Sequence, residues 1–145
     1  MNATTTPGRR SFRIGLWIAY WVLIFIATHL PPQSPMLRLT FNVPDWLMHF
    51  LVYAALGFLI IWARPARFLD RWRSGGWPAV APRLAVWAGI ILAYAALDEL
   101  TQPFIGRHCQ LSDWTADALG AVLGLLLTAL IYVHAFGRQP VGVTE

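Results

Sequence analysis

The sequence predicts an all-α fold, a bundle of four transmembrane helices with both termini in the cytoplasm. Three observations support this. Hydrophobic residues make up 57% of the 145 residues and charged residues only 12%, a more apolar balance than a soluble domain usually has. The apolar residues gather in four long segments, and a helix needs about 20 such residues to cross a bilayer. The basic residues, which are all arginine, flank these segments.

The first segment, Ile14–Leu30, is long enough to span a membrane. Arg9, Arg10 and Arg13 precede it, as in a signal peptide. However, the apolar core of a signal peptide has about 7–15 residues and is followed by a cleavage site with small residues. The stretch "IFIATHLPPQ" contains no convincing cleavage site. We therefore expect an uncleaved first helix.

The second and fourth segments, Trp46–Ala63 and Trp114–Phe136, also reach the length of a spanning helix. In the third segment the uncharged run covers only Leu84–Leu97, which would also suit a re-entrant piece. Including the acidic turn that follows extends this segment to Pro103, about 20 residues. The sequence thus predicts a third spanning helix over 84–103.

The arginines predict the orientation, because basic residues near the ends of spanning segments stay in the cytoplasm. With the N-terminus inside, only Arg38 and Arg107 of the eleven arginines lie outside, and the outer face is net acidic. We therefore expect cytoplasmic tails over 1–13 and 137–145 around a membrane domain over 14–136. The arginines expected inside are Arg9, Arg10, Arg13, Arg64, Arg67, Arg71, Arg73, Arg83 and Arg138.

The two longer connections differ in chemistry. Residues 31–44 are rich in proline, which predicts an extended outer loop. Residues 64–83 are basic and aromatic, and their first half could lie along the lipid headgroups as a short amphipathic helix. The simpler interpretation of this connection is a cytoplasmic anchor with no other task.

Several functional classes lack support. The basic pI of about 10.0 does not indicate nucleic acid, because the arginines lie beside apolar runs. The expected partner is the lipid bilayer, and the sequence does not indicate an oligomeric state. Cys109 is the only cysteine, which excludes a disulfide within the chain and a cysteine metal site. The sequence has no H-E-x-x-H, G-x-S-x-G or phosphate-binding glycine-rich loop, so no recognised enzyme class is indicated.

Acidic residues should meet at one end of the bundle. The second helix begins there, the third ends there and the fourth begins there, so their acidic ends share one depth. A spacing of four residues places side chains on one helical face. Glu99 lies about 100° around the helix from Asp98, which predicts that one of the two faces solvent or Arg107. Convergence of the polar faces of the second, third and fourth helices predicts a small polar pocket that opens outward. The three faces are Asp45–His49–Tyr53, Asp98–Gln102 and Asp113–Asp117.

Structural and functional interpretations compete for the members of this group. His49 could be a hydrogen-bonded core histidine, or an acid–base group whose tautomer is fixed by Asp45. Asp117 could bridge helices, although an acid inside a spanning segment is a functional candidate by default. Arg107 could neutralise a neighbouring acid, or grip an anionic headgroup as a planar fork.

The same residues offer oxygen and nitrogen donors that a divalent cation such as Mg²⁺ accepts, although such a set is unspecific. The glycines of Gly120-x-x-x-Gly124 fit close helix packing. The candidate catalytic residues are His49, Glu99 and Asp98, and the candidate ligand-binding residues are Asp45, Tyr53, Gln102, Arg107, Asp113 and Asp117.

The stretches "THLPP", "PDWLMHFLVYAALGF" and "LDELTQPFIGRHCQLSDWTADALGAVLG" resemble the VanZ-like family of bacterial integral membrane proteins over residues 28–125. Trp46 stands where a lysine is usual in that family, and Asp117 stands where asparagine is frequent. The resemblance implies a multi-pass protein of the bacterial cytoplasmic (inner) membrane. The positions that match are Asp45, His49, Phe50, Tyr53, Leu56, Gly57, Asp98, Glu99, Gln102, Phe104, Gly106, Arg107, Asp113, Asp117, Gly120 and Gly124.

The resemblance also directs the functional hypotheses. The family is named after a protein encoded with glycopeptide-resistance genes, which gives low-level resistance to teicoplanin, and no reaction is established for the family as a whole. The preferred hypothesis is an envelope protein that binds or processes an amphiphilic ligand, such as a lipid-linked cell-wall intermediate or a lipoglycopeptide. The alternatives are an enzyme acting on a lipid phosphate and a structural partner that packs against another envelope protein.

Overall fold

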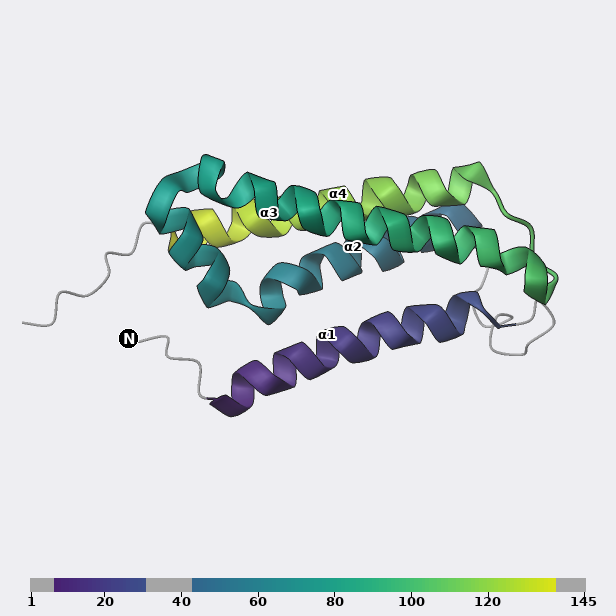
Figure 1. The fold of residues 1–145 in the computed structure, drawn as a ribbon, viewed down its shortest axis with the longest axis horizontal. Helices are drawn as coiled ribbons and strands as arrows, with labels where there is room; N and C mark the ends of the chain where they lie inside the picture. The colour runs from purple at the N-terminus through teal and green to yellow at the C-terminus, as the bar shows by residue number, and fades with distance from the viewer. Residues whose placement is uncertain (1–6, 31–42, 138–145) are drawn as a thin grey trace, which may run out of the picture.

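The structure, a computed structural model, describes residues 7–30 and 43–137. Successive helices run in opposite directions, as Figure 1 shows, and the described residues contain no strand. This confirms the all-α, four-helix prediction. The elements are α1 (Pro7–Thr28), α2 (Asp45–Ala63), α3 (Pro65–Thr101), the short 3-10 helix η2 (Gln102–Ile105) and α4 (Leu111–Phe136).

The chemistry of the four helices identifies a multi-pass membrane protein. Each is long and apolar enough to cross a bilayer, and large apolar side chains remain on their outer surfaces, for example Leu23, Leu127 and Ile131. Helices satisfy their own backbone groups, so such surfaces suit hydrocarbon. The first turn of α1 and the last turn of α4 lie at the same end of the bundle (Figure 1). The proline-rich loop over 31–44, which includes Arg38, and the C-terminal residues from Arg138 lie almost entirely outside the described residues.

Helix α1 begins at Pro7 rather than at Ile14, so part of the predicted N-terminal tail is helical. Proline suits the first turn of a helix, where its missing N–H has no partner. The guanidinium group of Arg13 lies 5.0 Å from the centre of the Trp62 ring, a cation–π contact. The basic residues before the apolar run thus belong to the helix, and Arg13 contacts α2.

The basic connection over 64–83 is helical as well, which corrects its description as a loop before a helix at Leu84. Helix α3 begins at Pro65 and bends at Gly75 and Gly76. Gly76 has a φ of 59°, a conformation that glycine adopts without steric strain. The first leg of α3, before this bend, corresponds to the short helix predicted for the first half of the connection. The second leg carries Pro78 in its first turn, where proline is tolerated.

Helices α2 and α4 pack at close range through glycines. A Cβ atom added to Gly120 would collide with the carbonyl oxygen of Phe50, and one added to Gly124 would collide with that of Ala54. Gly57 on α2 approaches the backbone of α4 in the same way. The packing role predicted for Gly120 and Gly124 is confirmed, and it fixes the register between the two helices that carry His49 and Asp117.

Helix α1 contacts the other helices mainly through aromatic rings. The centre of the Trp17 ring lies 5.7 Å from that of Trp87 on α3 and 5.6 Å from that of Trp21, its neighbour on α1. The ring centres of Trp21 and Tyr94 are 5.4 Å apart, and the Tyr20 hydroxyl donates to the carbonyl oxygen of Val52 at 3.0 Å. All three ring pairs are edge-on, a favourable arrangement for aromatic side chains.

Candidate functional site

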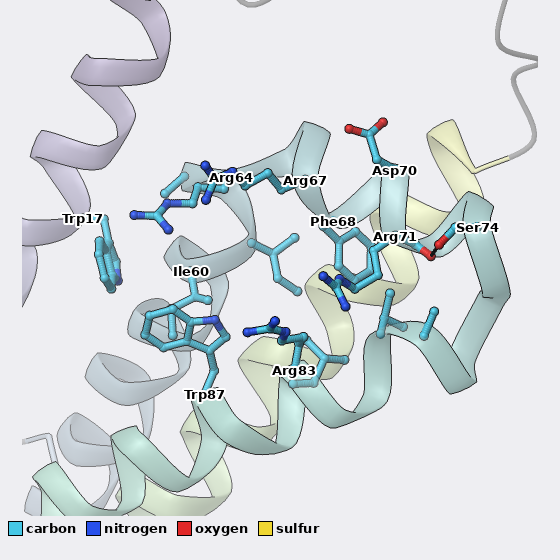
Figure 2. A pocket seen from close by; sticks show the side chains of 15 residues that line it. Trp17, Ile60, Arg64, Arg67, Phe68, Asp70, Arg71, Ser74, Arg83 and Trp87 are labelled. Atoms are coloured by element: carbon cyan, nitrogen blue, oxygen red, sulfur yellow. Dashed lines mark hydrogen bonds between the residues drawn. The ribbon is translucent and has the colours of Figure 1, made fainter.

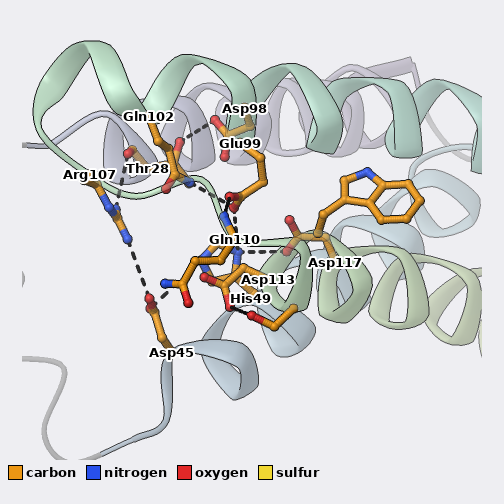
Figure 3. A network of polar contacts seen from close by, with 12 residues as sticks. Thr28, Asp45, His49, Asp98, Glu99, Gln102, Arg107, Gln110, Asp113 and Asp117 are labelled. Carbon is orange, nitrogen blue, oxygen red and sulfur yellow. Dashed lines mark hydrogen bonds and ion pairs between the residues drawn. The ribbon is translucent and has the colours of Figure 1, made fainter.

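The acidic end of the bundle assembles as the sequence predicts. Figure 3 shows side chains from the start of α2, the end of α3 and the start of α4 pointing toward one another. Exposed fractions are 7% for His49, 2% for Glu99, 4% for Asp113 and 0% for Asp117. Charged groups are seldom buried this deeply unless they are paired.

His49 lies at the centre of the acidic end. Its Nδ1 atom is 3.0 Å from Asp117 Oδ1 and 3.9 Å from Glu99 Oε1. Its Nε2 atom is 3.9 Å from Asp45 Oδ1 on the next turn of α2. A neutral imidazole has only one N–H to donate. Its one N–H can therefore be donated on one side of the ring only, and the contact at hydrogen-bonding distance is the one with Asp117.

Asp98 and Glu99 are both buried, with 2% of each residue exposed. This corrects the prediction that one of them faces solvent or Arg107. Asp98 faces α1, where it accepts a hydrogen bond from Thr28 Oγ1 at 2.7 Å and lies 3.5 Å from His29 Nδ1. Glu99 faces the opposite interface, toward His49. The angle between neighbouring residues of α3 therefore places the two carboxylates on two interfaces of the bundle.

Two hydrogen bonds hold Glu99. Its Oε1 atom accepts from Gln102 Nε2 and its Oε2 atom accepts from the backbone N–H of Gln110, both at 3.0 Å. The chain tightens from an α-helix to a 3-10 helix at Gln102. Gln102, expected on the face of Asp98, thus binds the neighbouring carboxylate.

Arg107 reaches the opening of the site from the turn between η2 and α4. Gly106, with a φ of 78°, ends η2 in a left-handed conformation that favours glycine. Arg107 Nη1 then donates to the carbonyl oxygen of Thr28 at 3.3 Å, and Nη2 lies 3.9 Å from Asp45 Oδ2. Among the described acids, Asp45 is the one within ion-pair distance of Arg107.

Several buried polar atoms at this end have no hydrogen-bond partner among the described residues. They are Oδ2 of Asp98, Oδ2 of Asp117 and the hydroxyl groups of Tyr53 and Tyr94. A buried polar group without a partner is unfavourable by about 1–3 kcal/mol. Such groups mark places where a proton, a water molecule or a ligand group would be stabilised.

Two overlapping sets of side chains have the composition of a cation site. The donor atoms of Asp45, His49 and Asp113 all lie within 4.8 Å of one another, and so do those of His49, Glu99 and Asp117. Carboxylate oxygens with an imidazole nitrogen suit a divalent cation. Both sets share His49, and Asp98 belongs to neither, because it faces α1.

Helix α1 contributes polar contacts to this end that were not predicted from the sequence. Besides the bond from Thr28 to Asp98, His29 Nε2 lies 3.0 Å from the hydroxyl oxygen of Thr101 on α3. These contacts tie the end of α1 to the acidic end of the bundle. The available signal was the stretch "THLPP", in which two polar residues close an otherwise apolar helix.

The site is accessible beside Asp45 and Arg107. The Asp45 side chain is 59% exposed and the Arg107 side chain 17%, whereas the groups behind them are buried. The pocket that the sequence predicts here stays a prediction. Large apolar side chains lie exposed on the same ends of the helices: Trp46, Leu100, Phe104 and Leu111.

No curated protein and no solved structure matches the chain. A family model described as VanZ/LLP1 matches residues 14–132, which include most of all four helices and every member of the acidic end. The match agrees with the resemblance in the motifs around His49, Asp98 and Asp117. This chain therefore belongs to the VanZ/LLP1 family.

Proposed function

We propose that the acidic end of the bundle binds the headgroup of an amphiphile at the outer face of the bacterial cytoplasmic membrane. The ligand class is a lipid-linked cell-wall intermediate or a lipoglycopeptide such as teicoplanin. One observation carries the proposal: buried carboxylates from α3 and α4 converge with His49 beside the more exposed side chains of Asp45 and Arg107. Charged groups at this depth of a membrane protein are unfavourable unless they serve a site or a pair.

The chemistry of the opening fits a headgroup with hydroxyl, amide or ammonium groups. Carboxylates accept hydrogen bonds from such groups, and the planar guanidinium of Arg107 matches a phosphate or carboxylate. The exposed apolar residues at the same end, among them Trp46 and Phe104, would contact the lipid part of the ligand. Both parts of an amphiphile thus find a complementary surface.

Native mass spectrometry of the gently extracted protein tests this proposal. The wild-type protein is expected to retain a lipid-linked saccharide or peptide, or added teicoplanin. Arg107→Ala and Asp45→Asn are expected to reduce retention by about tenfold, because each removes a charged ligand contact worth roughly 1.5 kcal/mol. Arg10→Gln, which removes an exposed charge from the first turns of α1 and lies outside both sites, is the control and should retain the ligand. Equal retention by all four proteins would contradict the proposal.

A second function is an enzyme that hydrolyses or transfers a group on a lipid phosphate. The two cation-binding sets that share His49 favour it. Asp113 and Asp117 would hold Mg²⁺, which would supply positive charge to the reacting phosphate, and Arg107 would bind the phosphate. His49 or Glu99 would take a proton from water while the water oxygen bonds to phosphorus. The phosphoester bond would then break, and the departing oxygen would receive a proton.

Binding of a divalent cation would distinguish this enzymatic function from binding of an amphiphile alone. Calorimetric titration of the purified protein with Mn²⁺ is expected to show one binding site. Asp45→Asn should weaken that site by about tenfold through loss of one charged ligand. The mutation is suitable because the Asp45 side chain is 59% exposed, so its structural effect should be small. Asp70→Asn removes an acid that belongs to neither candidate cation set, and it serves as the control for Mn²⁺ binding. If the wild-type protein did not bind Mn²⁺, the proposed metal-assisted reaction would be ruled out.

A further inference from the structure

A second site lies at the end of the bundle opposite the acidic residues. An open cavity of about 750 Å³ is lined by α1, the last turns of α2 and both legs of α3. Figure 2 shows its lining. His49 lies near the start of α2, whereas Ile60 and Ile61, which line this cavity, lie near its end. The two sites are thus separated by most of the length of that helix.

Arginines dominate the polar lining of the cavity. Arg64, Arg67, Arg71 and Arg83 line it, together with the single acid Asp70. In the part of the chain that the structure describes, the guanidinium groups of these four arginines make no hydrogen bond or ion pair. Like charges around one space repel one another, so an anion within the cavity would stabilise this arrangement.

The bend in α3 brings two of these arginines together. Arg71 lies on the first leg and Arg83 on the second, and Figure 2 shows both guanidinium groups pointing into the same space. The rule that basic residues stay in the cytoplasm requires only that they lie on one side of the membrane. It does not require that they converge on a cavity. A guanidinium pair of this kind suits a phosphate group, to which each can donate two hydrogen bonds.

The rest of the lining is apolar or aromatic. Ile60, Ile61 and Val80 are buried hydrophobic residues that line the cavity. Trp17 forms part of its wall, and the indole N–H of Trp17 is buried with no hydrogen-bond partner among the described residues. A basic rim over an apolar lining is complementary to an amphiphile rather than to a free ion.

A path for an apolar chain leads away from the cavity along α1. The ring of Trp17 contacts that of Trp21, with centres 5.6 Å apart, and Trp21 lines an almost wholly apolar groove of about 370 Å³. The two spaces therefore lie next to each other along the same face of α1. The groove is lined by Ile18, Trp21, Val22, Phe25 and Tyr94.

We propose that this arginine-lined cavity binds an anionic phospholipid. Arg71 and Arg83 hold its phosphate, and one acyl chain follows α1 from Trp17 to the groove beside Trp21. Basic pockets between transmembrane helices bind the headgroups of anionic lipids in this way. The site is independent of the function proposed for the acidic end.

The test compares lipid retention by the purified full-length protein in native mass spectrometry. Phosphatidylglycerol and phosphatidylcholine with identical acyl chains are added in equal amounts. The wild type is expected to prefer phosphatidylglycerol by roughly tenfold or more, because each arginine near an anionic lipid contributes about a factor of five. The double variant Arg71→Gln/Arg83→Gln should lose this preference. Arg64→Gln/Arg67→Gln is a second pair from the same cavity, and it should reduce the preference even if the first pair disturbs folding.

The matched control is Arg9→Gln/Arg10→Gln, which removes two charges from the first turns of α1, outside the cavity lining. It should keep the wild-type preference. Equal loss in this control and in the cavity variants would mean a general attraction of charge, and would overturn the proposal. Glycerol 3-phosphate is added as a competitor without acyl chains. If it displaced the lipid at equal concentration, the occupant would be a soluble phosphate and the proposal would be wrong.

Discussion

The pairing of His49 with Asp117 is the closest contact between the imidazole and a carboxylate at the acidic end. The two atoms lie 3.0 Å apart, and both residues are buried. The second oxygen of Asp117 has no partner among the described residues. Removal of one member of a buried charged pair is strongly destabilising, because the other member is left without compensation. The pair therefore links the stability of α2 and α4 to the chemistry of the site.

Asp117→Ala is expected to lower the free energy of unfolding by about 3 kcal/mol, because it leaves the His49 ring without its nearest acceptor. Asp117→Asn keeps an acceptor at that position and should lower it by less than about 1 kcal/mol. The control is Thr115→Ala, because that hydroxyl bonds only within its own helix and its loss should change stability by about 0.5 kcal/mol or less. The free energies of unfolding of all three variants are measured in detergent, with circular dichroism as the signal. A small effect of Asp117→Ala would show that the pair does not stabilise the bundle.

At the scale of helices, close contact between α2 and α4 sets the geometry of the site. Without a hydrophobic driving force between helices in lipid, packing depends on small residues that let backbones approach. Gly124 lies against the backbone of Ala54, so even a methyl group would separate the helices. The separation would also move Asp117 away from His49, because they lie on the same two helices.

Gly124→Ala should therefore lower the free energy of unfolding by about 1–3 kcal/mol, the range for forcing extra atoms into a packed interface. Gly89→Ala on α3 is the matched control, since an added Cβ there meets nothing within 4 Å. Alanine is the better helix former, so that variant should be at least as stable as the wild type. Thermal unfolding of both proteins in one detergent provides the comparison. Equal behaviour of the two variants would contradict the close approach of α2 and α4.

Across the whole molecule, charge is divided between the two ends of the bundle. The acidic residues meet at one end, and most of the described arginines lie at the other, where four of them line a cavity. This division is the pattern of a membrane protein whose arginine-rich end faces the cytoplasm.

The native cysteine provides a test of the resulting orientation. Cys109 is exposed and lies near the acidic end, between Arg107 and the start of α4. A membrane-impermeant maleimide should label it in intact cells. In the double variant Cys109→Ser/Ser74→Cys, the cysteine lies beside the bend of α3, and labelling should require broken membranes. The reverse pattern would place the acidic end in the cytoplasm and contradict the proposal that it binds a ligand at the outer face of the membrane.

Much of the fold and of the candidate site was predictable from the sequence because the signals were local. Long apolar segments predicted the spanning helices, and a spacing of four residues brought Asp113 and Asp117 to one face. Glycines at Gly120 and Gly124 predicted close packing. The boundaries of α1 and α3 were less well predicted, because arginines and prolines obscured helical turns that are set by contacts such as that of Arg13 with Trp62.

The sequence by itself determined the class of protein, its four spans and the convergence of acids at one end, since these follow from hydrophobicity and helical periodicity. Only the tertiary structure decided which groups meet across helices. It placed Asp98 against Thr28 on α1 and Glu99 toward His49, and it folded Arg71 and Arg83 around one cavity. The reason is physical: periodicity specifies the face of a helix on which a residue lies, whereas the rotation, register and bend of neighbouring helices determine what that face contacts.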